Sequence, residues 1–223
     1  MLRRSPDAPR LAQRETLDAF EAALAASGLP LVTAGRARSR FAFGAPLAAG
    51  MPAERELADL VLADRIPVAV LRDRLTAALP AGWQLVDACD VWLGEPSVVS
   101  QVVAADYRVT VESADPGALE RAAAALLRAR SLPREREKGR GTVAYDLRPL
   151  FDDVLIDTDA GVGASLGAGE PRVTLRIRTR MHPELGAGRP DDVIAALGDE
   201  LGSVLVVAAI ARERVILAGD ISG

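Results

Sequence analysis

Residues 172–180, with the sequence RVTLRIRTR, alternate between polar and aliphatic side chains along most of their length. Successive side chains of a strand point to opposite faces of its sheet, so this alternation predicts a strand with one buried face. Val173, Leu175 and Ile177 would pack against helices, and the arginines would face outward. Such a strand is typical of an antiparallel sheet that is covered on one face only.

Helical and strand-like segments alternate along the rest of the chain. Helices are expected at 13–27, 67–79 and 116–129, and a short one from Asp191. Strands are expected at 29–33, 38–43, 54–63, 83–92, 106–112 and 204–217, with a charged hairpin at 134–146.

Strand pairs between the helices argue against a parallel sheet. We therefore predict an α+β fold of two ferredoxin-like β-α-β-β-α-β units, with antiparallel sheets and helices on one face. The units would span residues 11–100 and 101–223. The first unit lacks an evident opening strand, because MLRRSPDAPR is polar and broken by proline and is expected to be a disordered lead-in.

Composition excludes several classes of function. Hydrophobic residues make up 49% of the chain but aromatic residues only 4%, and the formal net charge of -4 argues against bulk electrostatic binding of nucleic acid. One cysteine, Cys89, and one histidine, His182, exclude a disulfide framework and a cage of several histidines. We expect Cys89 in a core strand and His182 in a turn. No signal peptide or membrane-spanning run is evident, so we expect a cytoplasmic protein without a cofactor, a metal or a catalytic constellation.

Basic side chains recur at alternate positions in three segments. They are Arg36, Arg38 and Arg40, then Arg134, Arg136, Lys138 and Arg140, then Arg172, Arg176, Arg178 and Arg180. On a strand each set would form a row on one face, and arginine makes bidentate hydrogen bonds to phosphate. The rows are therefore candidate sites for RNA or another anion. The alternative is a solvated sheet face, and in the hairpin Glu135 and Glu137 could pair locally with the basic residues.

Two other patterns suggest binding but favour simpler interpretations. The run GVGASLGAG (161–169) is followed by a predicted strand rather than a helix, so we expect a flexible connector rather than a phosphate loop. The acidic run FDDVLIDTD (151–159) lacks the spacing and the terminal glutamate of a calcium loop. We therefore expect a solvated loop and strand edge there, rather than metal ligation by Asp152, Asp153, Asp157 and Asp159.

Several segments, in the same order along the chain, resemble the radical-SAM-linked family that carries the domain of unknown function DUF2344. They are AALAASGLPL (22–31), FAFGAPLAAG (41–50), RLTAALPAGWQLVDA (74–88), ADYRVTVE (105–112), REREKGRGTVAYDLRPL (134–150) and RPDDVIAALG (189–198). The chain departs from the family at the start of the first helix, where LAQRE (11–15) has Gln13 in place of a histidine, and in the shortened loop TAGRARSR (33–40).

The resemblance implies an association with a radical-SAM protein, and in many genomes with neighbours that act on RNA or ribosomes. It also carries over Lys138, Asp146, Arg148 and Pro149, which match a segment that the family shares, and we add Arg148 to the candidate anion-binding residues. The chain itself is not the radical-SAM enzyme, because one cysteine cannot hold an iron–sulfur cluster that needs several thiolates.

Three hypotheses follow for the function. The first is an accessory protein that binds RNA or a ribonucleoprotein through the arginine-faced strands and works with a radical-SAM partner. The second is a module that docks onto that partner without nucleic acid, with an open sheet edge as its contact. The third, an RNA-processing enzyme, has the least support because no His, Tyr or Lys constellation is evident.

Overall fold

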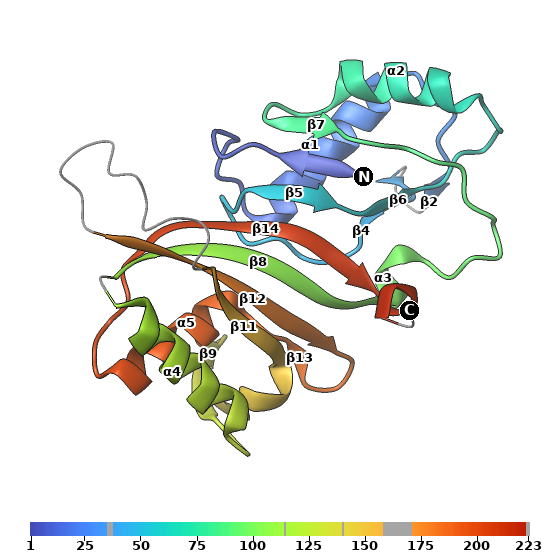
Figure 1. The fold of residues 1–223 in the computed structure, drawn as a ribbon. Coiled ribbons are helices and arrows are strands. Elements are labelled where there is room, and N and C mark those ends of the chain that lie inside the picture. The colour runs from blue at the N-terminus through green and yellow to red at the C-terminus, as the bar shows by residue number, and fades with distance from the viewer. Residues whose placement is uncertain (35–37, 114, 140, 158–170, 222–223) are drawn as a thin grey trace. The chain divides into compact units, whose positions relative to one another are not determined.

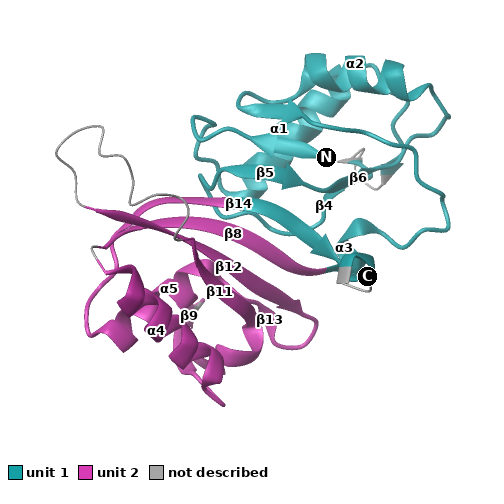
Figure 2. Cartoon of the chain, viewed as in Figure 1, with its two compact units in different colours: residues 1–102, 212–223 teal, residues 103–211 magenta. Residues whose placement is uncertain are grey.

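The chain forms two compact units (Figure 1, Figure 2). A computed structural model describes residues 1–34, 38–113, 115–139, 141–157 and 171–221. Unit 1 comprises residues 1–102 and 212–223, and unit 2 comprises residues 103–211. The described residues have a mixed α+β fold with mostly antiparallel strand pairs, as predicted. None of their helices is long and apolar enough to cross a membrane.

Unit 1 is built from short strands and two longer helices. Its elements are β1 (Leu2–Arg4), α1 (Gln13–Ala26), β2 (Thr33–Ala34), β3 (Arg38–Ser39), β4 (Phe41–Phe43), β5 (Ala53–Glu56), β6 (Ala58–Leu60), α2 (Val68–Ala78), β7 (Trp83–Leu85), α3 (Val98–Gln101) and the terminal η2 (Ala218–Ile221). Strand β1 lies between β5 and β7 and runs antiparallel to both. Strands β2 and β3 pair with each other, and so do β4 and β6.

Strand β1 shows that the expectation of a disordered lead-in was wrong. Leu2 pairs with Glu56 of β5 on one side and with Leu85 of β7 on the other. Leu2 and Arg4 are buried while Arg3 is exposed. The strand has only three residues, and one of its two buried positions is an arginine, so no apolar alternation marks it in the sequence. The open sheet edge expected from a missing first strand is therefore filled.

Two further strand predictions in unit 1 also need correction. The expected strand 54–63 is divided into β5 and β6, which pair in different ladders. The expected strand 83–92 ends at Leu85, because the amides of Val86 and Asp87 both donate to the carbonyl of Met1, next to the first residue of the partner strand β1. Cys89 lies beyond this point and is exposed rather than in the core.

The core of unit 1 forms around an aromatic cluster. Phe20 of α1 is 1% exposed, and its ring stacks on Phe41 with centroids 5.1 Å apart. Phe43 and Trp83 approach the same ring edge-on, each at 5.0 Å. The helical stripe predicted for α1 is thus confirmed at Phe20 and at Leu24, which is also buried.

A fully buried ion pair also lies in unit 1. Arg212 of β14 (Val207–Leu217) and Glu56 of β5 are 0% and 1% exposed. Arg212 Nε donates to Glu56 Oε1 at 2.7 Å, and its Nη2 donates to Oε2. Arg212 also donates to the carbonyls of Ala45 and Pro46. These hydrogen bonds therefore hold the segment after β4 close to β5. Strands β14 and β5 also pair directly, since Arg212 lies opposite Ala53.

Unit 2 is a sheet with helices on one face (Figure 1). Its elements are β8 (Val102–Glu112), α4 (Pro116–Arg128), β9 (Pro133–Lys138), β10 (Gly141–Asp146), η1 (Arg148–Leu150), β11 (Phe151–Asp157), β12 (Arg172–His182), β13 (Gly186–Ala187), α5 (Pro190–Leu201) and the first part of β14. The sheet order is β11-β12-β8-β14, and β12 runs antiparallel to both β8 and β11. Strands β9 and β10 form the predicted charged hairpin, with Gly139 at its tip in a left-handed conformation (φ 66°).

Buried aliphatic side chains of the sheet and the helices form the core of unit 2. They include Val109, Val111, Val173, Leu175 and Ile177 from the strands and Leu119, Leu126, Val193 and Leu197 from α4 and α5. Helix α4 begins as predicted, with the carboxylate of Asp115 accepting a hydrogen bond from Ala118 N at 2.8 Å. The apolar face expected for residues 172–180 is thus confirmed.

Candidate binding surface on strand β12

The arginine row predicted for residues 172–180 lies on the outward face of β12. Val173, Leu175 and Ile177 occupy the core face, so the arginines at alternate positions face away from α4 and α5. The outward residues of this row are Arg172, Arg176, Arg178 and Arg180, of which Arg178 is half-buried and the others are exposed. We call this row of arginines, together with Asp106 of β8 and Asp152 and Asp157 of β11, the β12 face.

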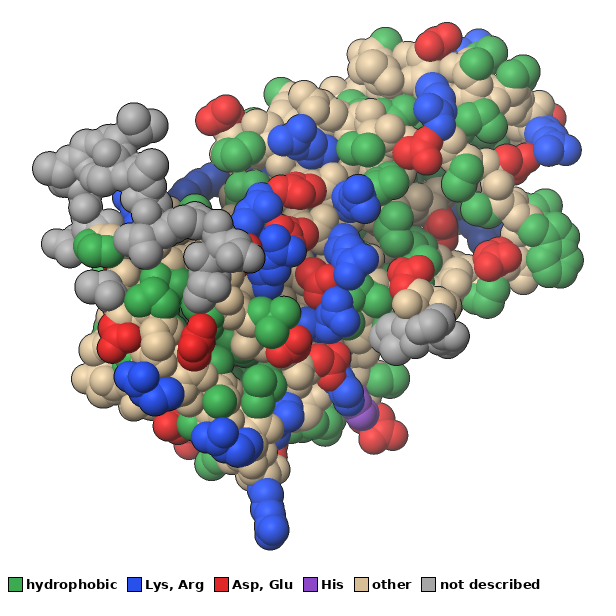
Figure 3. All heavy atoms as spheres, viewed as in Figure 1, with side chains coloured by type: hydrophobic (Ala, Val, Ile, Leu, Met, Phe, Trp, Pro, Cys, Tyr) green, Lys and Arg blue, Asp and Glu red, His purple; other side chains and the backbone are tan. Residues whose placement is uncertain are grey.

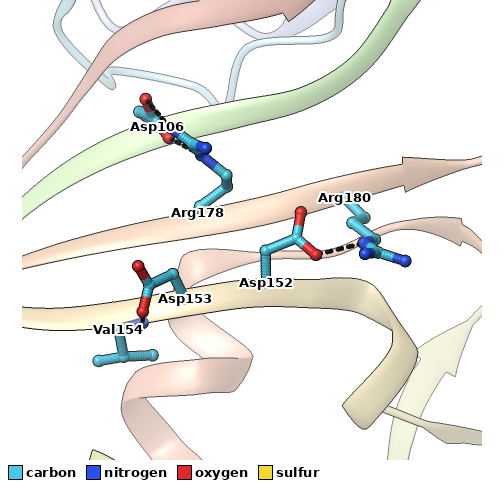
Figure 4. A network of polar contacts seen from close by, with 6 residues as sticks. All are labelled: Asp106, Asp152, Asp153, Val154, Arg178 and Arg180. Carbon is cyan, nitrogen blue, oxygen red and sulfur yellow. Dashed lines mark hydrogen bonds and ion pairs between the residues drawn. The ribbon is translucent and has the colours of Figure 1, made fainter. Parts of the chain in front are cut away.

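Carboxylates from the neighbouring strands pair with the arginines of the β12 face (Figure 4). Arg178 Nε donates to Asp106 Oδ1 at 2.7 Å, and Arg178 Nη2 donates to Asp106 Oδ2 at 3.0 Å. This bidentate geometry follows from strand register, because Arg178 lies directly opposite Asp106 on β8. On the other side Arg180 donates to Asp152 of β11.

A third arginine of the row, Arg176, forms an ion pair with Asp157 of β11 at 3.3 Å. Asp157, predicted to lie in a solvated loop or at a strand edge, is the last residue of β11, which stands at the end of the strand order beside β12. Hydrogen bonding to Asp106 raises the pKa of Arg178. The β12 face is therefore mixed in charge, and Figure 3 shows basic and acidic side chains interspersed over the viewed surface. A phosphate binding here would have to displace carboxylates that already hold the guanidinium groups.

The basic row of the β9–β10 hairpin points elsewhere. Arg134 forms an ion pair with Asp199 of α5 at 2.8 Å, and the guanidinium of Arg136 lies 4.8 Å from the ring centroid of Tyr145. Burial and a hydrogen bond with Asp192 of α5 raise the pKa of Tyr145 to about 12. These contacts hold the hairpin against α5, in the helical layer. Of the hairpin row, the described side chains of Arg134 and Arg136 therefore make their contacts in the hairpin and with α5 rather than beside the β12 row.

Two residues of the segment shared with the family have structural contacts. The carboxylate of Asp146 accepts hydrogen bonds from Leu132 N at 2.7 Å and Arg148 N at 2.9 Å. Arg148 donates to the carbonyls of Phe151 and Leu127, and its guanidinium lies 4.9 Å from the Phe151 ring centroid. These bonds shape the turn from the hairpin into β11. Lys138 closes the hairpin opposite Gly141.

The remaining predicted basic residues are only partly described. Arg40 is exposed in unit 1, and its carbonyl accepts a hydrogen bond from Val61 N at 3.0 Å. Arg38 pairs with Ala34 in the short ladder of β2 and β3. Arg36 and Arg140 lie outside the described residues, as does the glycine run 161–169. The first row thus belongs to unit 1, and the other two belong to unit 2.

Among the described residues no group of three or more His, Cys, Asp or Glu side chains is arranged to hold a metal ion. Asp159 of the acidic run lies outside these residues. His182 is the last residue of β12, and its Nδ1 accepts hydrogen bonds from Glu184 N and Leu185 N at 3.2 Å and 3.1 Å. The sequence predicted His182 in a turn, whereas the structure places it at the end of β12, where its side chain shapes the turn that follows.

An exposed apolar turn in unit 1 was not expected from the sequence. Val91, Trp92 and Leu93 are 59%, 77% and 91% exposed. Glu95 N donates to the carbonyl of Trp92 at 2.9 Å and closes the turn. The Trp92 ring lies over Gly94, where an added Cβ would come within 2.4 Å of it. We call residues 91–95 the Trp92 turn.

The sequence of the turn, VWLGE, contains residues typical of a turn, but we interpreted it as the end of a strand. Three bulky apolar residues followed by glycine, between Asp90 and Glu95, fit a turn as well as the end of a strand. The deciding fact is tertiary, since the pairing of β7 with β1 ends at Leu85 and the amides of Val86 and Asp87 both turn to the carbonyl of Met1.

Comparison with known proteins adds a family match. The sequence profile of the family described as "Uncharacterized protein conserved in bacteria (DUF2344)" matches residues 3–178 of the 223. The match covers the Trp92 turn and all of β12 as far as Arg178. No curated protein matches the chain.

Proposed function

This chain belongs to the DUF2344 family, and we propose that it is a non-catalytic accessory protein that docks onto a protein partner through the Trp92 turn. The observation that carries the proposal is the exposure of three consecutive large apolar residues, among them a tryptophan that is 77% exposed. Tryptophan is enriched among the residues that supply most of the binding energy of protein interfaces. Large apolar side chains clustered on a surface are typical of an interaction site.

The surroundings of the turn indicate the chemistry of the partner surface. Asp90 and Glu95 flank the apolar residues, and Asp90 forms an exposed ion pair with Arg65 at 2.8 Å. A matching partner would offer an apolar pocket with a largely basic rim.

We propose that the partner is a radical-SAM protein. The support is the family resemblance, which associates such chains with radical-SAM proteins. A docking role also fits the chain's own residues, because its single cysteine cannot hold an iron–sulfur cluster. The partner would then supply the chemistry, and this chain would supply recognition or positioning.

The test is direct binding between purified proteins. Radical-SAM proteins of the same organism, each purified with its cluster intact, would be titrated one at a time against the chain by biolayer interferometry. Trp92→Ala and Leu93→Ala should each weaken binding by about 30-fold or more, the effect of a central interface residue. Gly94→Ala should weaken it less, because the added Cβ displaces the Trp92 ring without removing it.

Val204→Ala is the matched control, since Val204 is 92% exposed and lies in unit 2. It should leave binding unchanged. Failure of the chain to bind any radical-SAM protein would contradict the proposal. Binding that survives both Trp92→Ala and Leu93→Ala would exclude the turn as the contact.

RNA is a second candidate partner, favoured by the partial exposure of the β12 arginines. The side chains of Arg176 and Arg180 are 56% and 54% exposed although both are paired, so a phosphate could approach them. The check is a gel-shift titration with total tRNA and rRNA at several salt concentrations. Absence of binding at low salt, or binding unchanged by the double change Arg176→Glu and Arg178→Glu, would exclude this candidate.

We further propose that both units are ferredoxin-like. In unit 2 the order β8-α4-β11-β12-α5-β14, with the β9–β10 hairpin as an insertion, and the sheet order β11-β12-β8-β14 support this assignment. In unit 1 the order β1-α1-β5-α2-β7 around the sheet order β5-β1-β7 supports it. A crystal structure would test it, since β8 and β14 must then run antiparallel.

A further inference from the structure

A cavity of about 300 Å³ opens in unit 1 beside the aromatic cluster. Phe41, Phe43 and Trp83 form part of its wall, together with Pro46 and Leu47. Small-molecule sites in proteins are concave, mostly apolar and supplied with a few placed polar groups. The apolar wall meets the first part of that description.

The polar part is a buried arginine. Arg4 lines the cavity and is 4% exposed. Its Nη1 donates to the carbonyl of Met51 at 2.8 Å and its Nη2 to the carbonyl of Pro9 at 2.7 Å. Its Nε is buried without a hydrogen-bond partner. The guanidinium carbon also lies 5.9 Å from the centroid of the Trp83 ring, over its face.

No carboxylate among the described residues balances this charge. The second buried arginine of unit 1, Arg212, is paired with Glu56, whereas the polar partners of Arg4 are two neutral carbonyls. Burial lowers the pKa of Arg4, but the usual value for arginine is so high that the group stays charged. A buried charge is costly unless it is paired. An anion in the adjoining cavity would provide the missing partner.

The first turn of α1 adds favourable potential to the same cavity. Gln13, the first residue of α1, and Thr16, one turn further on, both line it. The first amides of a helix lack intrahelical acceptors, and the helix dipole places partial positive charge there. Glu15 satisfies one amide, since its carboxylate accepts from Ala12 N at 2.7 Å. The Gln13 amide and the Thr16 hydroxyl supply further polar groups for orienting a ligand.

We propose that this cavity binds a small carboxylate with an aromatic or bulky apolar body. The carboxylate would pair with Arg4, and the body would pack against Phe41, Phe43 and Trp83. Its volume of about 300 Å³ lies at the lower end of the range of small-molecule pockets, so the ligand should be small. The apolar wall disfavours inorganic phosphate and other fully hydrated anions.

The test compares acids with their neutral amides. Benzoate, 3-phenylpropionate and indole-3-propionate, each beside its amide, would be titrated into the full chain by isothermal calorimetry, with inorganic phosphate as a bare anion. At least one acid should bind with a Kd of about 1 mM or below. Its amide should bind about tenfold more weakly or worse, because a charge-assisted hydrogen bond is lost. Tryptophan fluorescence in a Trp92→Phe background, which leaves only Trp83, should change on binding.

Matched variants assign the effect to the cavity. Arg4→Met should abolish the preference for acid over amide, while Arg3→Met, on the exposed face of the same strand, should preserve it. Ala48→Trp, at an exposed position lining the cavity, should block all binding without disturbing the core. Absence of binding by every acid, equal binding of acid and amide, or a preference that survives Arg4→Met would overturn the proposal.

Discussion

Arginine is placed in several different environments in this chain, and only one of them is readable from sequence spacing. The row on β12 follows from alternation with aliphatic residues, and the structure has these arginines facing outward. Arg4 and Arg212 are buried, although neither stands in a pattern that predicts burial. Their burial depends on distant partners: carbonyl groups for Arg4, and Glu56 for Arg212. Spacing along one segment carries no information about such partners.

Removing one partner of the Glu56–Arg212 pair should destabilise the fold strongly, whereas replacing both partners with apolar residues should destabilise it little. Glu56→Ala would leave a charged guanidinium buried, so we expect the free energy of unfolding to fall by about 3–5 kcal/mol. The double change Glu56→Met and Arg212→Met should recover most of that loss, because an apolar pair carries no desolvation cost. Urea unfolding would measure both. Arg55→Met, at the exposed position beside Glu56, should stay within about 0.5 kcal/mol of the native chain.

Asp146 should make stability depend on pH in acid. Burial acts to raise its pKa, but hydrogen bonds from Leu132 N, Arg148 N and Ser131, with the charge of Arg148, lower it below the usual 3.8. A lowered folded-state pKa contributes stability that is present above pH 3.8 and is lost as the pH falls through the folded value. Asp146→Ala should therefore cost about 1 kcal/mol at pH 7 and progressively less below pH 4. A difference that stays constant from pH 7 to pH 3 would contradict this role.

At the scale of elements, the longer segments were predictable and the shortest were not. Helices α1, α4 and α5 and strand β12 each repeat their apolar period several times, and each forms close to its predicted position. Strand β1 has three residues, too few to show a period, and it exists because β5 and β7 pair with it. The expected strand through Trp92 failed for the converse reason, since none of the described strands pairs with Val91, Trp92 or Leu93. Whether a short segment forms a strand therefore depends on the tertiary structure, because neighbouring strands must pair with it.

The bidentate pair between β12 and β8 should contribute modestly to stability. A double-mutant cycle on Arg178→Gln and Asp106→Asn should give a coupling free energy of about 0.5–1 kcal/mol, as for partly exposed pairs. Raising the salt from about 0.05 M to 1 M should reduce the coupling, because the side chain of Arg178 is 38% exposed and is screened by ions. Coupling near zero at low salt would show that the pair is only a packing arrangement.

At the scale of the whole molecule, the sequence predicted the α+β class but not which charges meet. Arg178 and Asp106 are 72 residues apart in the chain, and Arg180 and Asp152 are 28 apart. Only the register of three strands brings them together. The arginine rows could therefore be predicted as rows, while their neutralisation could not. The Trp92 turn and the Arg4 cavity were equally hidden, since both depend on where β1 lies.

The aspartates that pair with the β12 arginines should weaken the binding of nucleic acid to the β12 face. The chain has a formal net charge of -4, and changing Asp106, Asp152 and Asp157 to Asn would bring it to -1 while freeing three arginines from their ion pairs. We expect the native chain to bind a tRNA mixture only weakly at low salt, because Arg176, Arg178 and Arg180 are already paired with aspartates. The triple variant should bind more tightly, with an affinity that falls steeply as salt rises, as counterion release requires.

Gel shifts at about 0.05 M and 0.2 M salt would measure this, with circular dichroism to confirm that the variant is folded. A folded triple variant that binds RNA no better than the native chain would show that the carboxylates do not limit access to the β12 arginines.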